Sequence, residues 1–158
     1  MSKKIPLMLV AGAASAIASR PIATLTSSDA FTLSGVHIAG TSVSAWPLTI
    51  GDEIKDLAAP AVIHFADNTQ IGVSKGSSVK LEFVGGRTVV RLTSGSMTYQ
   101  SGSSQAIRVF ALDKEVNSAQ ANISIKGNDV SVNHPDHPLH PTHPVAPPEK
   151  PPGRSQGE

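Results

Sequence analysis

Apolar and polar residues alternate through the middle of this chain, between residues 61 and 92. Four short apolar runs lie there, separated by three clusters of turn-forming residues. The runs cover residues 61–66, 70–74, 78–84 and 87–92, and the clusters are Asp67-Asn68-Thr69, Lys75-Gly76-Ser77 and Gly85-Gly86. Because successive side chains of a β-strand point to opposite faces, this alternation predicts a β-meander with one buried face.

Shorter apolar runs flank the meander and predict further strands. They cover residues 21–26, 30–34, 36–39 and a few residues around Ile54 before it, and residues 96–100, 105–112, 122–126 and 129–132 after it. Turns are predicted at Thr93-Ser94-Gly95 and Gly127-Asn128, and the Ser/Gly-rich stretch 94–104 predicts a flexible turn. No window shows a sustained helical period. We therefore expect an all-β fold, either a sandwich or stacked short antiparallel strands.

The first 18 residues consist of a basic start and an apolar stretch. Lys3 and Lys4 precede residues 5–18, which end on the small-residue pattern Ala16-Ile17-Ala18, with Ala14-Ser15-Ala16 as a second option. This arrangement is typical of a cleaved secretory signal peptide, and the β domain would then cover residues 19–132. An uncleaved membrane anchor is the alternative, but the apolar stretch is shorter than the roughly 20 residues that span a bilayer.

From residue 133 onward the composition changes abruptly, and proline becomes frequent. The tail, residues 133–158, begins with four copies of His-Pro-x, at His134, His137, His140 and His143. In polyproline II geometry such histidines lie about 9 Å apart along the axis, which is too far for two of them to share one Zn²⁺. We therefore predict a disordered spacer and assign no metal ligand. Chelation by a bent tail and a pH-dependent cationic rod remain alternatives.

Composition restricts the function further. The chain of 158 residues is long enough for one domain, has a formal net charge of +1 and contains no cysteine. The lack of cysteine excludes disulfides and thiolate metal sites, and the near-zero charge argues against nucleic-acid binding. We find no metalloprotease, nucleophile-elbow or phosphate-loop motif. The sequence therefore predicts no enzyme activity, no catalytic residue and no cofactor.

A few positions invite a functional interpretation, and each also has a structural one. Asp52 and Glu53 are adjacent carboxylates, but neighbours in a strand point to opposite faces and do not converge on one substrate. His37 and His64 fall in predicted strands, where we expect a surface or inter-sheet hydrogen-bonding role. Trp46 is the only tryptophan, and we expect it to cap the core rather than to hold a ligand.

The order and spacing of several turn motifs resemble the FecR-type domain. The motifs are Gly51-Asp52, Ala66-Asp67-Asn68-Thr69, Ser78-Val79-Lys80-Leu81 and Leu92-Thr93-Ser94-Gly95. Asn68 stands where the family usually has Gly, and Asn tolerates the same left-handed backbone. The resemblance implies a β domain and an exported bacterial location. FecR itself is a membrane-spanning sensor regulator, and the chain shows no counterpart of its cytoplasmic part, so iron signalling is not implied.

These observations lead us to expect a FecR-like β domain that is periplasmic or secreted. It would act as a non-enzymatic binding or scaffolding module of the cell envelope. Its partner would be another envelope protein or a surface polymer, and exposed strand edges offer one means of contact. No membrane span is expected after signal cleavage. The alternatives are a metal-handling envelope protein that uses the His-Pro-x repeat and a sensor component of envelope signalling.

Overall fold

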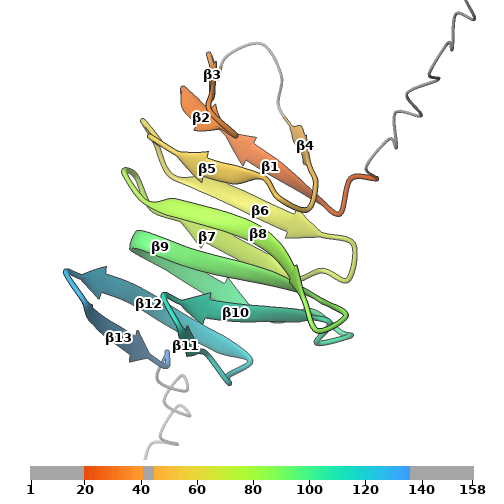
Figure 1. The fold of residues 1–158 in the computed structure, drawn as a ribbon, viewed down its shortest axis with the longest axis vertical. Helices are drawn as coiled ribbons and strands as arrows, with labels where there is room; N and C mark the ends of the chain where they lie inside the picture. Colours follow the sequence, from red (N-terminus) through yellow and green to blue (C-terminus); the bar gives the residue numbers. More distant parts are fainter. Residues whose placement is uncertain (1–19, 41–44, 136–158) are drawn as a thin grey trace, which may run out of the picture.

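The computed structural model describes residues 20–40 and 45–135, and it contains strands and no helix in these ranges (Figure 1). The all-β prediction is therefore confirmed for this part of the chain. The strands are β1 (Ala23–Ser27), β2 (Phe31–Leu33), β3 (Val36–Ile38), β4 (Trp46–Leu48), β5 (Glu53–Lys55), β6 (Ala61–Phe65), β7 (Gln70–Val73), β8 (Ser78–Val84), β9 (Arg87–Gln100), β10 (Ile107–Ala111), β11 (Lys114–Glu115), β12 (Gln120–Lys126) and β13 (Asp129–Asn133).

The strands form two layers that share strand β9 (Figure 1). Sheet A has the order β4-β1-β6-β7-β9-β12-β13, and sheet B has the order β3-β2-β5-β8-β9-β10-β11. All pairs are antiparallel except β9 with β10, which run parallel. Residues 87–92 of β9 lie in sheet B, and residues 95–100 lie in sheet A.

The central stretch is not the meander that we predicted from the alternation. Strand β7 pairs with β9 and not with β8, because the turn at Lys75-Gly76-Ser77 carries the chain from sheet A to sheet B. Most of the predicted apolar faces are nevertheless correct, since Ile63, Ile71 and Leu81 are all fully buried. The exception is Phe83, which the alternation predicts to face inward with Leu81 and which is 61% exposed near the end of β8. The alternation fixed which side of each strand faces inward, but it contains no information about which sheet the strand joins.

The predicted turn at Thr93-Ser94-Gly95 is also wrong, since these residues are a bend inside one continuous strand. Gly95 has a φ of 85°, a backbone conformation that favours glycine, and the register with β8 shifts between Ser78 and Val79. The inward-facing positions change phase there, from Leu92 in sheet B to Met97 in sheet A. We call this feature the bend.

Ser77 holds the bend in place from the turn between β7 and β8. Its hydroxyl donates to the carbonyl oxygen of Ser96 at 3.0 Å and accepts from the backbone N–H of Ser96 at 2.9 Å. The side chain is only 1% exposed, and a Cβ atom on Gly95 would lie 2.2 Å from its Oγ. The bend therefore requires a residue without a side chain at position 95 and the buried hydroxyl of Ser77 beside it.

One cluster of apolar side chains fills the space between the two sheets. Trp46 packs against it, with its ring edge-on to Phe31 at a centroid distance of 6.1 Å, so the prediction that it caps the core is confirmed. Its Nε1 is buried without a hydrogen-bond partner among the described residues.

Several predictions concern residues outside the described ranges. The signal segment lies within residues 1–19, and the tail beyond Pro135 is likewise not described. Within residues 20–40 and 45–135, the structure contains no helix that is long and apolar enough to cross a membrane.

Candidate functional site

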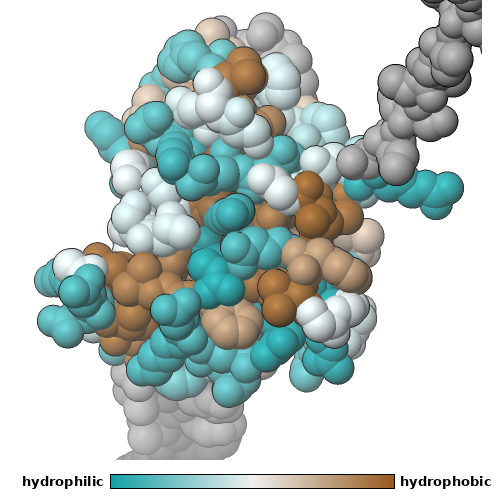
Figure 2. Space-filling model, viewed as in Figure 1, coloured by the Kyte–Doolittle hydropathy of each residue, from teal (hydrophilic) through white to brown (hydrophobic). Residues whose placement is uncertain are grey.

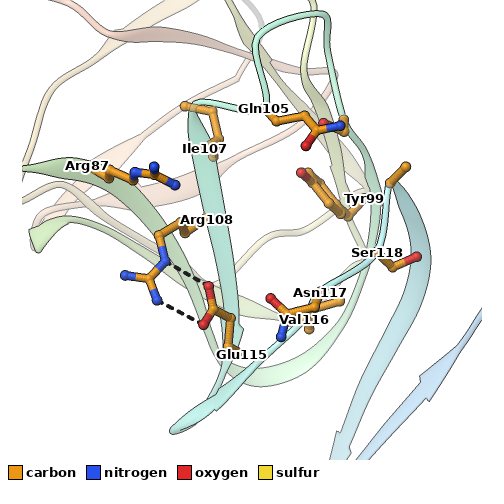
Figure 3. A pocket seen from close by; sticks show the side chains of 11 residues that line it. Arg87, Tyr99, Gln105, Ile107, Arg108, Glu115, Val116, Asn117 and Ser118 are labelled. Atoms are coloured by element: carbon orange, nitrogen blue, oxygen red, sulfur yellow. Dashed lines mark hydrogen bonds and ion pairs between the residues drawn. The ribbon is translucent and has the colours of Figure 1, made fainter. Parts of the chain in front are cut away.

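The bend brings the two ends of β9 to one pocket at the opposite end of the molecule. A straight strand of its fourteen residues would span about 46 Å. Instead, Arg87 at its start and Tyr99 near its end line the same cavity of about 360 Å³ (Figure 3). Sheet B supplies Arg87, Ile107 and Arg108, and the loops before β10 and after β11 complete the wall. We call this pocket the mouth.

One ion pair forms part of the wall of the mouth. Arg108 donates from Nε and Nη2 to the two carboxylate oxygens of Glu115, at 2.7 and 2.8 Å. The hydrogen bond from Arg108 outweighs the smaller effect of burial, so the pKa of Glu115 lies below its ordinary value and that of Arg108 lies above it. This pair is thus charged throughout the physiological pH range.

Arg87 supplies an unbalanced positive charge at the same site. No carboxylate of the described residues forms an ion pair with it, although its charge contributes to the lowered pKa of Glu115. In Figure 3 its guanidinium lies beside Arg108 at the edge of the cavity. Two guanidinium groups and one carboxylate leave the mouth with a net positive charge, which suits an anionic ligand group.

An exposed aromatic ring lies two strands away from the wall of the mouth. Phe83 is 61% exposed, and it stands directly opposite Thr88, which in turn stands opposite Ile107 in the wall of the cavity. The adjacent loop carries Gln105 in a left-handed conformation, with a φ of 49°. Non-glycine residues rarely adopt this conformation, and where they do it often occurs at functional sites.

The loop after β9 is firmly anchored, contrary to the predicted flexible turn at residues 94–104. Asp67 accepts hydrogen bonds from the hydroxyl of Ser104 at 2.6 Å and from the N–H of Thr69 at 2.9 Å. The N–H of Gly102 donates to the fully buried hydroxyl of Thr69 at 2.9 Å. Burial raises the pKa of Asp67, but the hydrogen bonds from Ser104 and Thr69 outweigh it, so this pKa lies below its ordinary value.

A second surface of interest is the outward face of sheet A. Gln70, Gln100 and Gln120 stand opposite one another on neighbouring strands, and so do Gly72, Thr98 and Asn122. All but Gly72 are exposed, and a Cβ atom on Gly72 would lie 2.6 Å from the Oγ1 of Thr98, so the Thr98 hydroxyl packs over this glycine. This face therefore carries amide and hydroxyl groups in regular rows, at the spacing of the strands.

Three shallow hollows of about 310, 290 and 170 Å³ follow one another across this face. The first shares Gln120 and Pro135 with the second, and it shares Thr98 and Asn122 with the third. Among the described residues that line these hollows, none is Asp, Glu, Lys or Arg, and His134 is the only histidine. We call these joined hollows the neutral groove. It adjoins the mouth, because Ser101 and Ser118 line both.

The residues that the sequence singled out do not form a site. Asp52 accepts hydrogen bonds from Ser34 and Thr49 and so fixes its own turn, while Glu53 pairs with Lys55. His37 and His64 are exposed on strands of different sheets, as a surface role requires.

The tail is represented only by its first residues. Of its four histidines, His134 is described, and His137, His140 and His143 lie outside the described residues. No group of three or more potential metal ligands occurs in the described part of the chain.

Both candidate surfaces were missed by sequence reasoning for the same reason. Arg87 and Tyr99 are twelve positions apart in one strand, and only the bend brings them together. The glutamine row comes from three strands that are not consecutive in the chain. A usable signal did exist: Gln70 and Gln100 are the end residues of predicted strands, and Gln120 lies two residues before the strand predicted at 122–126.

Comparisons of the chain with protein-family models, with curated proteins and with solved structures find no match. The resemblance to the FecR-type domain therefore rests on the turn motifs of the sequence. In the structure two of these motifs have turn-forming roles: Asn68 has a φ of 67°, and Asp52 and Asp67 each accept backbone N–H groups within their own turns. The other two motifs lie within strands β8 and β9.

Proposed function

We propose that this chain is an exported, FecR-like β domain that acts as a non-enzymatic binding module for a polysaccharide of the bacterial cell envelope or surface. The neutral groove on sheet A would be its principal binding surface, and the mouth would receive acidic groups of the polymer. The module would be periplasmic or secreted, as the predicted signal segment and the family resemblance indicate.

The observation that carries this proposal is the chemistry of the neutral groove. Glutamine and asparagine side chains each offer both donors and acceptors, and hydroxyls do the same, which matches the alternating donors and acceptors of sugar hydroxyl groups. The exposed large hydrophobic residues in the described ranges, Val36, Ile50, Phe83 and Val84, lie outside this groove. Tyr99, Met97 and Ile123 line the groove but are buried, so the described part of it lacks the exposed apolar and aromatic anchors that characterise the centre of most protein interfaces.

The positive charge of the mouth also favours a polysaccharide ligand, specifically one that carries acidic groups. Arg87 would pair with a carboxylate of the polymer. Because the mouth adjoins the groove at Ser101 and Ser118, one chain could lie along both. The neutral groove would then set the general affinity, and Arg87 would favour polymers that contain uronic acid.

The proposal is tested by affinity electrophoresis of the full chain through gels that contain dextran, xylan, hyaluronan or alginate. Gly72→Val displaces the hydroxyl of Thr98 and places methyl groups in the groove, and Thr26→Val adds the same kind of side chain at an exposed position of the same face, outside the hollows. We expect at least one polysaccharide to retard the wild type, Gly72→Val to lose most of this retardation, and Thr26→Val to keep it.

The same gels test the role of Arg87. Arg87→Gln should weaken binding to hyaluronan or alginate and leave binding to the uncharged polymers unchanged, whereas Lys75→Gln, which removes an exposed charge in a distant turn, should change neither. If no polysaccharide retards the wild type, or if Gly72→Val and Thr26→Val behave alike, sugar binding by the groove is refuted.

A further inference from the structure

The two sheets end in four edge strands within the described residues, and these edges are not equally protected. Strands β4 and β13 are the edges of sheet A, and β3 and β11 are the edges of sheet B. An edge strand presents unpaired N–H and C=O groups that can pair with another chain, so folded proteins usually block them with proline, charge or short length.

Three of the edges carry such protection. Strand β4 contains Pro47, which has no N–H to donate. Strand β11 has only two residues, one of them Lys114, and β3 has three. Strand β13 differs, since it has five residues, and its interior, Val130-Ser131-Val132, has neither a proline nor a charge.

A hollow of mixed character lies under the unprotected edge. The cavity of about 500 Å³ between the β10–β11 turn and the β12–β13 turn is lined by the apolar residues Ala111, Leu112 and Val130 and by the polar residues Asp113, Lys114, Asn128 and Asp129. Figure 2 shows a hydrophobic area on this side of the molecule, where the β12–β13 hairpin lies beside β10. Val130 and Val132 are half-buried on the inward side of β13.

The C-terminal end of the described chain leaves this edge open. After β13, His134 and Pro135 line the neutral groove next to Ser118 and Gln120, so these two residues lie on the β12 side of the chain and do not cover the free edge of β13. In Figure 1, β13 is the outermost strand at its end of sheet A.

We propose that β13 pairs with β13 of a second copy of this chain, in antiparallel orientation and centred on Ser131. In this register Ser131 stands opposite its own counterpart, Val130 stands opposite Val132, and Asp129 stands opposite Asn133. All five residues are paired and no like charges face each other. A slip by one residue would place valines opposite residues of the other face, and a slip by two would leave fewer pairs.

The symmetric pairing has two structural consequences. It joins both copies of sheet A into one continuous sheet, with the two outward faces on the same side, so that the two neutral grooves lie side by side. It also extends the apolar layer under the edge, because Val132 of the second copy lies next to Val130 at the hollow. A five-residue strand contact is smaller than the interfaces of about 1,200–2,000 Å² that hold stable complexes, so the dimer is weak and depends on concentration.

The absence of cysteine makes a direct test possible. Residues directly opposite in an antiparallel pair have Cα atoms about 4.5–5.5 Å apart, which suits a disulfide. Ser131→Cys should therefore form a disulfide-linked dimer of the full chain under mild oxidation. Ser124→Cys is the matched control, since Ser124 is the partner of Ser131 on the same face but one strand further from the edge, and it should stay monomeric.

Sedimentation equilibrium of the cysteine-free chain completes the test. The wild type should show a monomer–dimer equilibrium, and Ser131→Lys, which places like charges opposite each other only in the dimer, should lower the association constant by about tenfold or more. Ser131 is exposed in the monomer, so this variant should fold normally. The proposal is overturned if the wild type stays monomeric at millimolar concentration, if both cysteine variants cross-link equally, or if Ser131→Lys dimerises as well as the wild type.

Discussion

The bend and the mouth are the two ends of the same folded-over strand, and they are held by different chemistry. At the bend, a buried serine hydroxyl bonds the backbone of Ser96, and no ionisable group takes part. At the mouth, the loop after β9 is tied to the carboxylate of Asp67, and the wall contains the Arg108–Glu115 ion pair. The Ser77 hydroxyl at the bend is buried, whereas the mouth is open to water.

Within strand β9, the bend therefore contributes mainly to stability and the mouth mainly to the proposed binding. Packing at the bend leaves no room for a side chain on Gly95, so that end should determine whether the two layers form at all. The mouth retains a cavity and an unbalanced Arg87, which do little for stability. Variants at the two ends should therefore differ sharply in what they damage.

The largest effect is expected for Gly95→Ala. Alanine at this position would have to adopt the positive φ of Gly95, which non-glycine residues disfavour. Its Cβ would also lie 2.2 Å from the Oγ of Ser77. We expect a loss of about 3 kcal/mol or more in the free energy of unfolding, from backbone strain and overpacking together. Urea denaturation followed by circular dichroism measures it.

Gly127→Ala is the matched control for the bend. Gly127 has a φ of 61° in the β12–β13 turn, and a Cβ there would meet nothing within 4 Å. Only the backbone strain should therefore remain, and it should lower the free energy of unfolding by about 1 kcal/mol. Equal losses in the two variants would contradict the view that close packing against Ser77 is what makes the bend sensitive.

An intermediate effect is expected from lowering the pH. Because the pKa of Asp67 is lower in the folded state than in the unfolded chain, its contribution is complete above the unfolded value of about 3.9 and is lost as the pH falls through the folded value. Glu115 contributes with the same sign. Thermal unfolding between pH 7 and pH 2 should therefore show a loss of stability below about pH 4.

Asp67→Asn assigns this loss to the mouth. The variant should lose about 1 kcal/mol at pH 7, from its weakened hydrogen bonds to Ser104 and Thr69, and it should depend less on pH than the wild type. Amide chemical shifts of Ser103 and Ser104 should move on acidification, while that of Ser96 at the bend should not. If the amide chemical shift of Ser96 changed over the same pH range as those of Ser103 and Ser104, the bend and the mouth would not be independent.

The smallest effect on stability is expected for Arg87→Gln. Arg87 is exposed and forms no ion pair with a described residue, so the free energy of unfolding should change by less than about 0.5 kcal/mol. Its urea midpoint should match that of the wild type even if binding to acidic polysaccharides falls. A loss above about 1 kcal/mol would mean that the guanidinium supports the fold.

The sequence by itself determined the all-β class, the inward side of most strands and several of the turns. These properties are local: alternation at period two assigns a face to each side chain, and Gly or Asn supplies a left-handed turn wherever one is needed. Asn68, Gly85-Gly86 and Gly127 were found in this way, and each has a positive φ in the structure.

Only the tertiary structure decided how the strands are shared between the sheets. Contacts between residues far apart in the chain decide three features. Strand β7 pairs with β9, strand β9 bends at Gly95, and Arg87 and Tyr99 line the same pocket. Thr69 and Ser77 look like ordinary turn residues in the sequence, yet both are buried and hold other segments in place. Such roles arise from long-range packing, and the local pattern of residues contains no record of it.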